Sequence, residues 1–202
     1  MAIKNIIVDL GGVLLKGKPS SVLEKITDYS GDYHKLLLFF EHWENIDLGV
    51  QTLEEQYEKC NYPSDLSALY KNSLLHYYQF REINHDVMFL LHQLREQDYH
   101  LFILSDIGFE ASSYYKKQDY FQIFDQWILS CDYNAMKKDG KLFDVLCEKY
   151  QLNPKECYFI DDQFENIQIG KKYGFVSFLF HEEEDILTLY YDMKKNQILI
   201  DE

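Results

Sequence analysis

The stretch Ile6-Ile7-Val8-Asp9-Leu10-Gly11-Gly12-Val13-Leu14-Leu15 decides the fold of this chain. Its first three residues are β-branched and form an apolar run, which is typical of a strand buried on both faces of a parallel sheet. The run stops at a carboxylate that precedes two glycines. We therefore expect a strand that delivers Asp9 to a tight turn, where its carboxylate is a candidate nucleophile.

The composition limits the class of protein and its partners. The chain has 202 residues, of which 47% are hydrophobic and 16% aromatic, as expected for one globular domain or a core with a modest insert. Its net charge of -14 disfavours nucleic acid and anionic membranes as partners, because both attract clusters of lysine and arginine. A small anionic substrate is compatible with this charge if a metal ion or a few lysines reverse the field locally.

The cysteine pattern and the amino terminus predict a cytoplasmic protein. The four cysteines have neither metal-finger nor redox-motif spacing and are too few for a disulfide framework. The amino terminus lacks the apolar region of a signal peptide, and no stretch reaches transmembrane length. The histidines show no HxH or HExxH spacing, which argues against zinc. We expect a monomer or a weak homodimer.

Residues 16–81 carry helical patterns without a convincing strand. We expect four helices there. Pro19 is expected in the first turn of the first helix, and the second helix is expected to begin at about Asp32. Thr52 and Ser64 are expected to cap the third and the fourth. The first helix is expected to run to about Ser30 and the second to end at Gly49, and Glu55 completes a capping box with Thr52. The apolar segment 36–40 with Trp43 predicts burial between helices, with a ligand pocket as the alternative.

From residue 82 onward, amphipathic helices alternate with buried apolar runs, which predicts an α/β fold with a Rossmann-like parallel sheet. After the first strand, we expect strands at residues 101–106, 127–130, 157–160 and 176–180. The helix before the last strand should end at Gly174, and the last helix should begin with the acidic residues 182–185. We predict a core of residues 1–15 and 82–202 and a four-helix cap subdomain of residues 16–81.

Polar residues follow the apolar runs of the expected strands, and in an open parallel sheet such strand ends meet at one edge, where ligands bind. These residues are Asp9, Ser105 with Asp106, Lys137 in the loop after the third strand, and Asp161 with Asp162. Carboxylates forced together raise one another's pKa unless a cation neutralises them. Because oxygen ligands favour Mg²⁺, we expect Mg²⁺ as the cofactor.

The four motifs DLGGV, LFILSD, AMKK and FIDDQFEN resemble, in order, those of the haloacid dehalogenase (HAD) superfamily. Their central residues Asp9, Ser105, Lys137 and Asp162 are separated by 96, 32 and 25 residues. The chain is similar in particular to phosphatases of this superfamily with a helical cap inserted after the first strand. The likeness covers nearly the whole chain and implies a HAD-like core and a small phosphorylated metabolite as the substrate.

The resemblance also implies roles for individual residues. Asp9 would attack phosphorus and become an aspartyl-phosphate, while Lys137 would neutralise the phosphoryl group and steady Asp9. The phosphate-binding residues would be Ser105, Asp106, Lys137, Leu10 and Gly11, although an aspartate such as Asp106 is also a common turn or capping residue. The Mg²⁺ ligands would be Asp9, the Gly11 carbonyl, Asp162 and Asp161, with Asn166 orienting metal-bound water.

Two residues depart from the pattern of the family. The phosphatases usually carry a second aspartate, a general acid and base, where this chain has Gly11, and a proline where it has Lys138. We therefore expect a phosphatase for a small metabolite such as a sugar phosphate, whose leaving oxygen needs little protonation. The alternatives are a silent relative that binds a phosphorylated ligand or a protein, and a dehalogenase, against which the paired Asp161 and Asp162 argue.

The cap of these phosphatases closes over the strand ends and should set the substrate. Three basic residues flank the junctions between the expected cap and the core, namely Lys16, Lys18 and Arg81. They could meet a polar substrate, with an ordinary surface position as the alternative.

Overall fold

The structure is a computed structural model that describes residues 2–21, 33–62, 68–181 and 186–198. Its five strands are β1 (Asn5–Val8), β2 (His100–Ser105), β3 (Gln126–Leu129), β4 (Cys157–Asp161) and β5 (Val176–Leu179). They form one parallel sheet in the order β3-β2-β1-β4-β5, with β1 at its centre. The predicted α/β fold with a Rossmann-like parallel sheet is confirmed.

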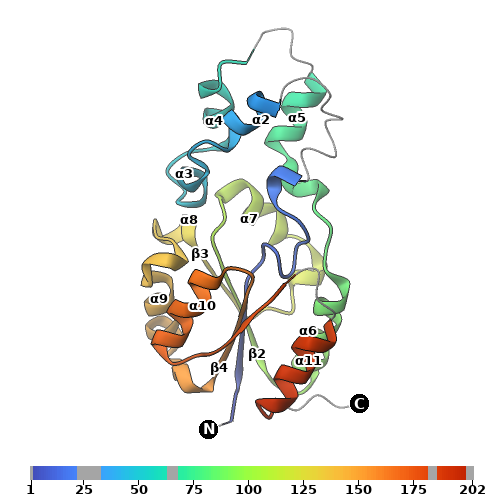
Figure 1. The fold of residues 1–202 in the computed structure, drawn as a ribbon, viewed down its shortest axis with the longest axis vertical. Helices are drawn as coiled ribbons and strands as arrows, with labels where there is room; N and C mark the ends of the chain where they lie inside the picture. The colour runs from blue at the N-terminus through green and yellow to red at the C-terminus, as the bar shows by residue number, and fades with distance from the viewer. Residues whose placement is uncertain (1, 22–32, 63–67, 182–185, 199–202) are drawn as a thin grey trace.

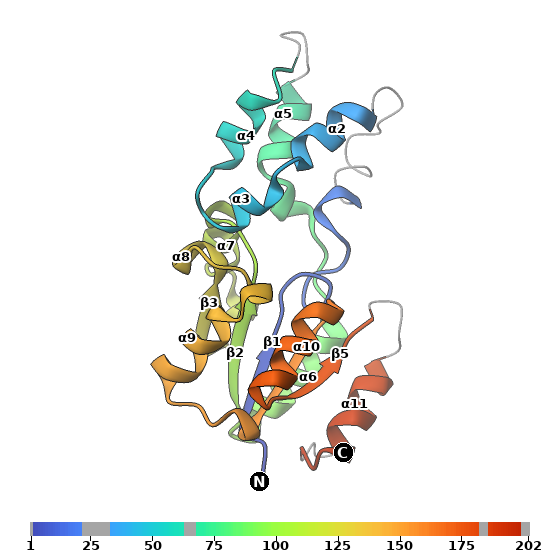
Figure 2. The same cartoon turned by 60° about the vertical axis from the view of Figure 1, so that its left-hand side comes forward.

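Helices cover both faces of the sheet, as Figures 1 and 2 show. Successive side chains of β1 point to opposite faces. Ile6 and Val8 belong to the core cluster that includes residues of α6 (His85–Glu96) and α11 (Ile186–Lys195). Ile7 belongs to the cluster that includes residues of α9 (Lys141–Tyr150) and α10 (Phe164–Tyr173). All four residues of β1 are buried, which explains why its sequence is apolar without alternation.

Short helical elements complete the region after residue 76. They are η1 (Tyr77–Phe80), α7 (Phe109–Tyr115), η2 (Asp119–Phe121), α8 (Ser130–Tyr133), η3 (Lys137–Asp139) and η4 (Pro154–Glu156). The prediction that Ser130 ends the third strand is wrong, because Ser130 is the first residue of α8. Its hydroxyl accepts a hydrogen bond from the Ile107 backbone N–H at 2.8 Å, which holds this turn against the end of β2.

Several helices lie among the described residues between β1 and α6, and we call the following ones, together with η1, the helical insert. They are α2 (Tyr33–Phe40), α3 (Trp43–Asp47), α4 (Leu53–Lys59) and α5 (Ala68–Leu75). The capping box of α4 is confirmed: Thr52 Oγ1 accepts from the Glu55 N–H at 3.1 Å, and Glu55 Oε2 accepts from the Thr52 N–H at 2.8 Å. The expected helix beyond Ser21 and the expected caps at Ser64 and 182–185 lie outside the described residues.

The helix expected to end at Gly49 is in fact two helices. His42 has a φ of 60°, in the left-handed region, which a right-handed helix cannot contain. The chain therefore changes direction between α2 and α3. This break gives α3 its own orientation above the sheet, and α3 carries residues that matter for the candidate site.

The helical insert lies beyond the carboxyl ends of the central strands (Figures 1 and 2). The two chain segments that connect it run side by side, since Leu15 bridges Ile83 and the Lys16 N–H donates to the Glu82 carbonyl at 2.8 Å. The division into a core and a cap at residues 15/16 and 81/82 stays a prediction. No helix among the described residues is long and apolar enough to cross a membrane.

Candidate active site

Asp9 follows β1 directly and lies at the centre of the sheet's carboxyl edge. Its N–H continues the ladder by donating to the Ile160 carbonyl at 2.9 Å. Its Oδ1 accepts from the Leu10 N–H at 2.7 Å, and its Oδ2 lies 2.8 Å from Lys137 Nζ. Burial raises the pKa of Asp9 to about 7, despite the opposing effect of the Lys137 charge.

Lys137 joins the carboxylates of two strands. Its ammonium group lies 2.8 Å from Asp9 Oδ2 and 2.6 Å from Asp161 Oδ2, and its side chain is only 2% exposed. Burial alone would lower the pKa of Lys137, but the charges of Asp161 and Asp9 raise it above its usual range, so the side chain is a fixed cation. The backbone N–H of Lys137 donates to Asp106 Oδ1 at 2.9 Å, which anchors η3 to the segment after β2.

Asp161 is the last residue of β4 and Asp162 follows it, but the two have different surroundings. Asp161 is fully buried, and besides Lys137 its carboxylate accepts from the Gln163 N–H at 2.7 Å and from Asn166 Nδ2 at 3.1 Å. Asp162 is half-buried, and its Oδ2 accepts from Gln163 Nε2 at 2.8 Å. Burial raises the pKa of Asp162, and the neighbouring charge of Asp161 adds to the effect.

The three carboxylates Asp9, Asp161 and Asp162 fit a divalent cation. One oxygen atom from each lies within 4.8 Å of the others, a separation that lets them share one ion. The set is all oxygen, as Mg²⁺ prefers, and the pKa values of Asp9 and Asp162 are raised by burial and further by the charge of Asp161. Asp162 would supply the more accessible oxygens, since it is half-buried, and Asp161 the least accessible, since it is fully buried and accepts hydrogen bonds at both of its oxygen atoms.

Gly12 is required by the shape of this site. It has a φ of +72°, and a Cβ atom there would lie 2.3 Å from Asp162 Oδ2. Gly11 differs, because a Cβ atom at that position would meet only Arg81 Nη1, at 3.8 Å. The first glycine therefore leaves open space beside the candidate nucleophile, and the second allows the two carboxylate loops to approach.

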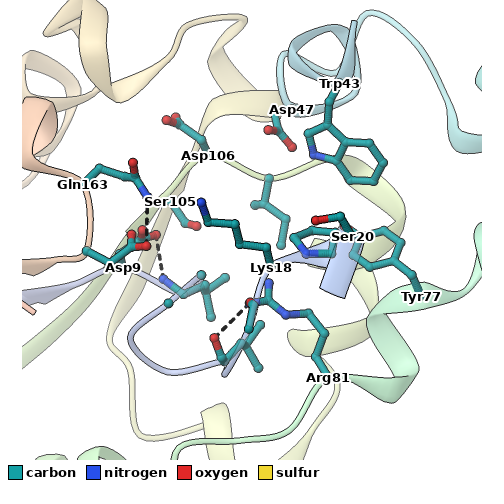
Figure 3. A pocket seen from close by; sticks show the side chains of 18 of the residues that line it. Asp9, Lys18, Ser20, Trp43, Asp47, Tyr77, Arg81, Ser105, Asp106 and Gln163 are labelled. Atoms are coloured by element: carbon teal, nitrogen blue, oxygen red, sulfur yellow. Dashed lines mark hydrogen bonds between the residues drawn. The ribbon is translucent and has the colours of Figure 1, made fainter. Parts of the chain in front are cut away.

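A cavity of about 440 Å³ opens over these groups, and Figure 3 shows its side chains. Its floor holds Asp9, Lys137 and Asp162 from the strand ends. Its opposite walls come largely from the helical insert and are mainly apolar or aromatic. The insert residues in this wall include Leu37, Phe40, Trp43, Asp47 and Tyr77. The strand ends and the insert thus enclose a space of the size that binds a small molecule.

The cavity brings together most of the residues that the sequence pointed to, but the fully buried Asp161 is not among those that line it. Leu10, Gly11, Ser105 and Asp106 line it, and Asn166 lies at its edge with Asp162. The Ser105 hydroxyl is nearly inaccessible from outside, at 2% exposure, and donates to no other described residue, so it is available to a ligand in the cavity.

Of the basic residues at the two connections, Lys18 and Arg81 line the cavity, whereas Lys16 does not. Arg81 is no ordinary surface group, because its guanidinium donates to the backbone carbonyls of Leu15, Lys16 and Gly17. Lys18 is exposed and extends into the cavity opening (Figure 3).

The cavity residues that sequence reasoning missed include Asp47, Tyr77, Tyr115 and Gln163. Asp47 lies two residues before Gly49, but no local pattern distinguishes it from the neighbouring acidic residues of α3. The apolar segment around Trp43 indicated a possible ligand pocket more clearly than Asp47 did. Phe39 is fully buried, whereas Leu37, Phe40 and Trp43 line the cavity, so both interpretations of that segment hold for different residues.

Comparison with solved structures supports the fold. A HAD family enzyme from Bacteroides thetaiotaomicron, solved with magnesium and inorganic phosphate, is 20% identical over 94% of this chain and 100% of that chain, with a TM-score of 0.68. A predicted HAD-like hydrolase from Porphyromonas gingivalis is 22% identical, over 96% and 99%, with a TM-score of 0.72. L-2-haloacid dehalogenase from Xanthobacter autotrophicus, with chloropropionic acid covalently bound, is 15% identical, over 98% and 84%, with a TM-score of 0.65.

At these identities the likeness shows the fold, and a comparison with curated proteins gave no significant match. A family model for haloacid dehalogenase-like hydrolases matches residues 3–174. This match contains the strand before Asp9, the helical insert, and the loops that carry Lys137 and Asp162. The chain therefore belongs to the haloacid dehalogenase-like hydrolases.

Proposed function

We propose that this hydrolase is a Mg²⁺-dependent phosphatase that cleaves a small phosphorylated metabolite through an aspartyl-phosphate on Asp9. The observation that carries the proposal is the buried ammonium group of Lys137, within 2.8 Å of Asp9 and 2.6 Å of Asp161. A fixed cation beside a carboxylate nucleophile suits an anionic electrophile, because it offsets the repulsion between the nucleophile and phosphate oxygens. Two HAD-fold structures from Bacteroides thetaiotaomicron that contain magnesium and inorganic phosphate agree with this chemistry.

Asp9 is positioned for attack by the groups that hold its carboxylate. The Leu10 N–H and the Lys137 ammonium each bind one of its oxygen atoms, which fixes the side chain toward the cavity. Attack on phosphorus would form the bond to Asp9 while the bond to the leaving oxygen breaks. The hydroxyl of Ser105, at the end of β2, and the Lys137 ammonium would hold phosphoryl oxygens during this step.

Asp9 and Asp162 would hold Mg²⁺, with the Gly11 carbonyl as a further ligand and Asp161 and Asn166 as supporting residues. When bound, the ion would polarise the phosphate and reduce its repulsion with Asp9. The main role of Asp161 would be to hold the Lys137 side chain in place, since its oxygen atoms accept hydrogen bonds from that ammonium group, from Gln163 and from Asn166. Asp106 acts through the Lys137 backbone, which it holds in place.

The cavity favours a sugar phosphate or a similar compact metabolite. Aromatic side chains such as Trp43 and Tyr77 can pack against a sugar ring, while Lys18 and Arg81 offer charges near the opening. The volume of about 440 Å³ suits a ligand of that size and excludes a folded macromolecule from the nucleophile.

A phosphate-release screen over sugar phosphates, other metabolite esters and p-nitrophenyl phosphate tests the proposed function. Mg²⁺-dependent release by the wild type, abolished by chelator and by Asp9→Asn, supports it. Binding of phosphorylated ligands without turnover would instead indicate a silent relative. Halide release from 2-haloacids that persists in chelator would indicate a dehalogenase, and either outcome would overturn the proposal.

A further inference from the structure

Asp47 is the carboxyl group that the helical insert places over the candidate nucleophile. It is the last residue of α3, and its side chain points into the cavity between Asp106 and Trp43 (Figure 3). The other insert side chains among the described cavity residues are apolar or aromatic. Asp47 is thus the single acid that the described part of the insert directs into the cavity.

The position of Asp47 is fixed through its backbone. The Ser130 hydroxyl donates to the Asp47 carbonyl, and Asn134 Nδ2 donates to the carbonyl of the next residue, Leu48, at 2.8 Å. Both donors belong to α8 and its carboxyl end, next to β3. The carboxyl group itself forms no hydrogen bond or ion pair with any described residue, so it is held in place and left available to a ligand.

Burial and the charges around Asp47 favour its protonated form. Burial raises its pKa well above the usual value, and the nearby negative charges of Asp106 and Asp9 add to the effect. Lys137 opposes the increase, and Glu44 on the same helix contributes to it. A further titratable group that interacts with Asp47 is Tyr77, which is itself buried with a pKa raised by that burial and by the Asp47 charge.

In-line attack places the leaving oxygen on the side of phosphorus opposite the nucleophile. Asp9 and Asp162 directly follow β1 and β4, and Lys137 of η3 lies beside Asp9, so an attack from Asp9 directs the leaving oxygen toward the insert. Gly11, directly beside Asp9, has no side chain that could give this oxygen a proton. Arg81, which also faces the cavity, is permanently cationic and bound to backbone carbonyls.

We propose that Asp47 is the catalytic residue that protonates the leaving oxygen, an inference that rests on the proposed phosphatase function. As the bond between Asp9 and phosphorus forms and the bond to the leaving oxygen breaks, the Asp47 proton passes to that oxygen. The alcohol departs neutral, and Asp47 becomes a carboxylate. This carboxylate then takes a proton from the water that attacks the aspartyl-phosphate, which releases inorganic phosphate, regenerates Asp9 and restores the acid form of Asp47.

The dependence of rate on the leaving group tests this role. Asp47→Asn is nearly isosteric, and Glu44→Gln removes a carboxyl group from the same helix at a half-exposed side chain. The substrates are p-nitrophenyl phosphate, whose leaving group needs no proton, phenyl phosphates of increasing leaving-group pKa, and the best alkyl phosphate from the screen. Asp47→Asn should lower kcat for the alkyl phosphate by about 10²-fold or more and for p-nitrophenyl phosphate by less than about 10-fold. Glu44→Gln should lower neither.

Each outcome separates the inference from the function on which it rests. If the wild type hydrolyses no ester, the proposed phosphatase function fails. If the wild type is active but Asp47→Asn slows all esters equally, or none, the role of Asp47 is overturned while the function stands. Asp47→Ser also removes the carboxyl group, and circular dichroism shows which variant folds, so that one folded variant decides the question.

Discussion

At the scale of single residues, Lys137 is the group on which the site depends most. Lys137→Met keeps the length of the side chain but leaves Asp9 and Asp161 buried without their cation. Breaking a buried ion pair in this way costs about 3–5 kcal/mol, so we expect a large loss in the free energy of unfolding. We also expect kcat to fall by at least about 10²-fold, since the charge that steadies nucleophile and phosphate is lost.

Lys138 provides the matched control for Lys137. Its side chain is 46% exposed and pairs with the half-exposed Glu44 at 2.8 Å. Such pairs contribute about 0–1 kcal/mol, so Lys138→Met should change denaturant stability little and retain activity. Equal losses in both variants would show that Lys137 does not act through its buried ion pairs.

We expect Gly11 and Gly12 to tolerate an added methyl group differently. In Gly12→Ala, the Cβ atom would lie 2.3 Å from Asp162 Oδ2, at a φ that disfavours side chains. We expect weaker Mg²⁺ binding, seen by calorimetry, and lower activity. Gly11→Ala meets only Arg81 Nη1 at 3.8 Å and should bind Mg²⁺ as the wild type does. Unchanged binding in Gly12→Ala would contradict the contact with Asp162.

At the scale of elements, Ser130 connects the core to α3 of the helical insert. Its hydroxyl accepts from the Ile107 N–H at 2.8 Å and donates to the Asp47 carbonyl. Ser130→Ala leaves the buried Ile107 donor without its acceptor, so we expect a loss of about 1–3 kcal/mol in thermal or denaturant unfolding. A matched Ser177→Ala substitution, at a half-buried hydroxyl on β5, should cost less. Equal costs would argue against the link between α8 and α3.

Elements with a long repeating pattern could be predicted from the sequence, and the contacts between elements largely could not. The strand that ends at Asp9 and the helix that ends before Gly174 follow from apolar periodicity and from a glycine at the helix end. The convergence of Asp9, Lys137 and Asp161 also follows, because parallel strand ends share one edge.

The cavity wall is different, because it depends on the left-handed backbone at His42 that separates α2 from α3. Histidine adopts that conformation more often than most residues do, but the signal is too weak to predict a break at this position. The orientation of α3, and with it the direction of Asp47, is therefore a property of tertiary contacts. For the same reason, sequence alone could not separate Arg81, which binds three backbone carbonyls, from a surface residue.

At the scale of the whole molecule, the carboxylate cluster should make the metal-free protein less stable as pH rises. The pKa of Asp9 is about 7 in the fold against an ordinary value of 3.8. Between these values the folded state holds a proton that the unfolded state has lost, so stability falls as pH rises through this window. Asp9→Asn should reduce the dependence, and its Tm should exceed that of the wild type increasingly from pH 4 to 7 in chelator.

Mg²⁺ should offset the loss of stability that the wild type shows as pH rises. An ion that binds only the folded state raises the Tm with its concentration, and the gain should be greatest above pH 7, where Asp9 is ionised. Asp9→Asn should gain less because it lacks one ligand. Differential scanning calorimetry at several pH values measures both effects, and a Tm of the wild type that does not respond to Mg²⁺ would contradict the metal site.

The most direct test of the account is the mass of the protein during turnover. Acid quenching of the wild type with Mg²⁺ and its best ester, followed by intact and peptide mass spectrometry, should show one added phosphoryl group on the peptide that contains Asp9. The group should be absent from Asp9→Asn and should disappear when the quenched sample is treated with hydroxylamine, which cleaves acyl phosphates. Phosphate release without any phosphorylated peptide, or with the same label in Asp9→Asn, would contradict the role of Asp9 as the nucleophile.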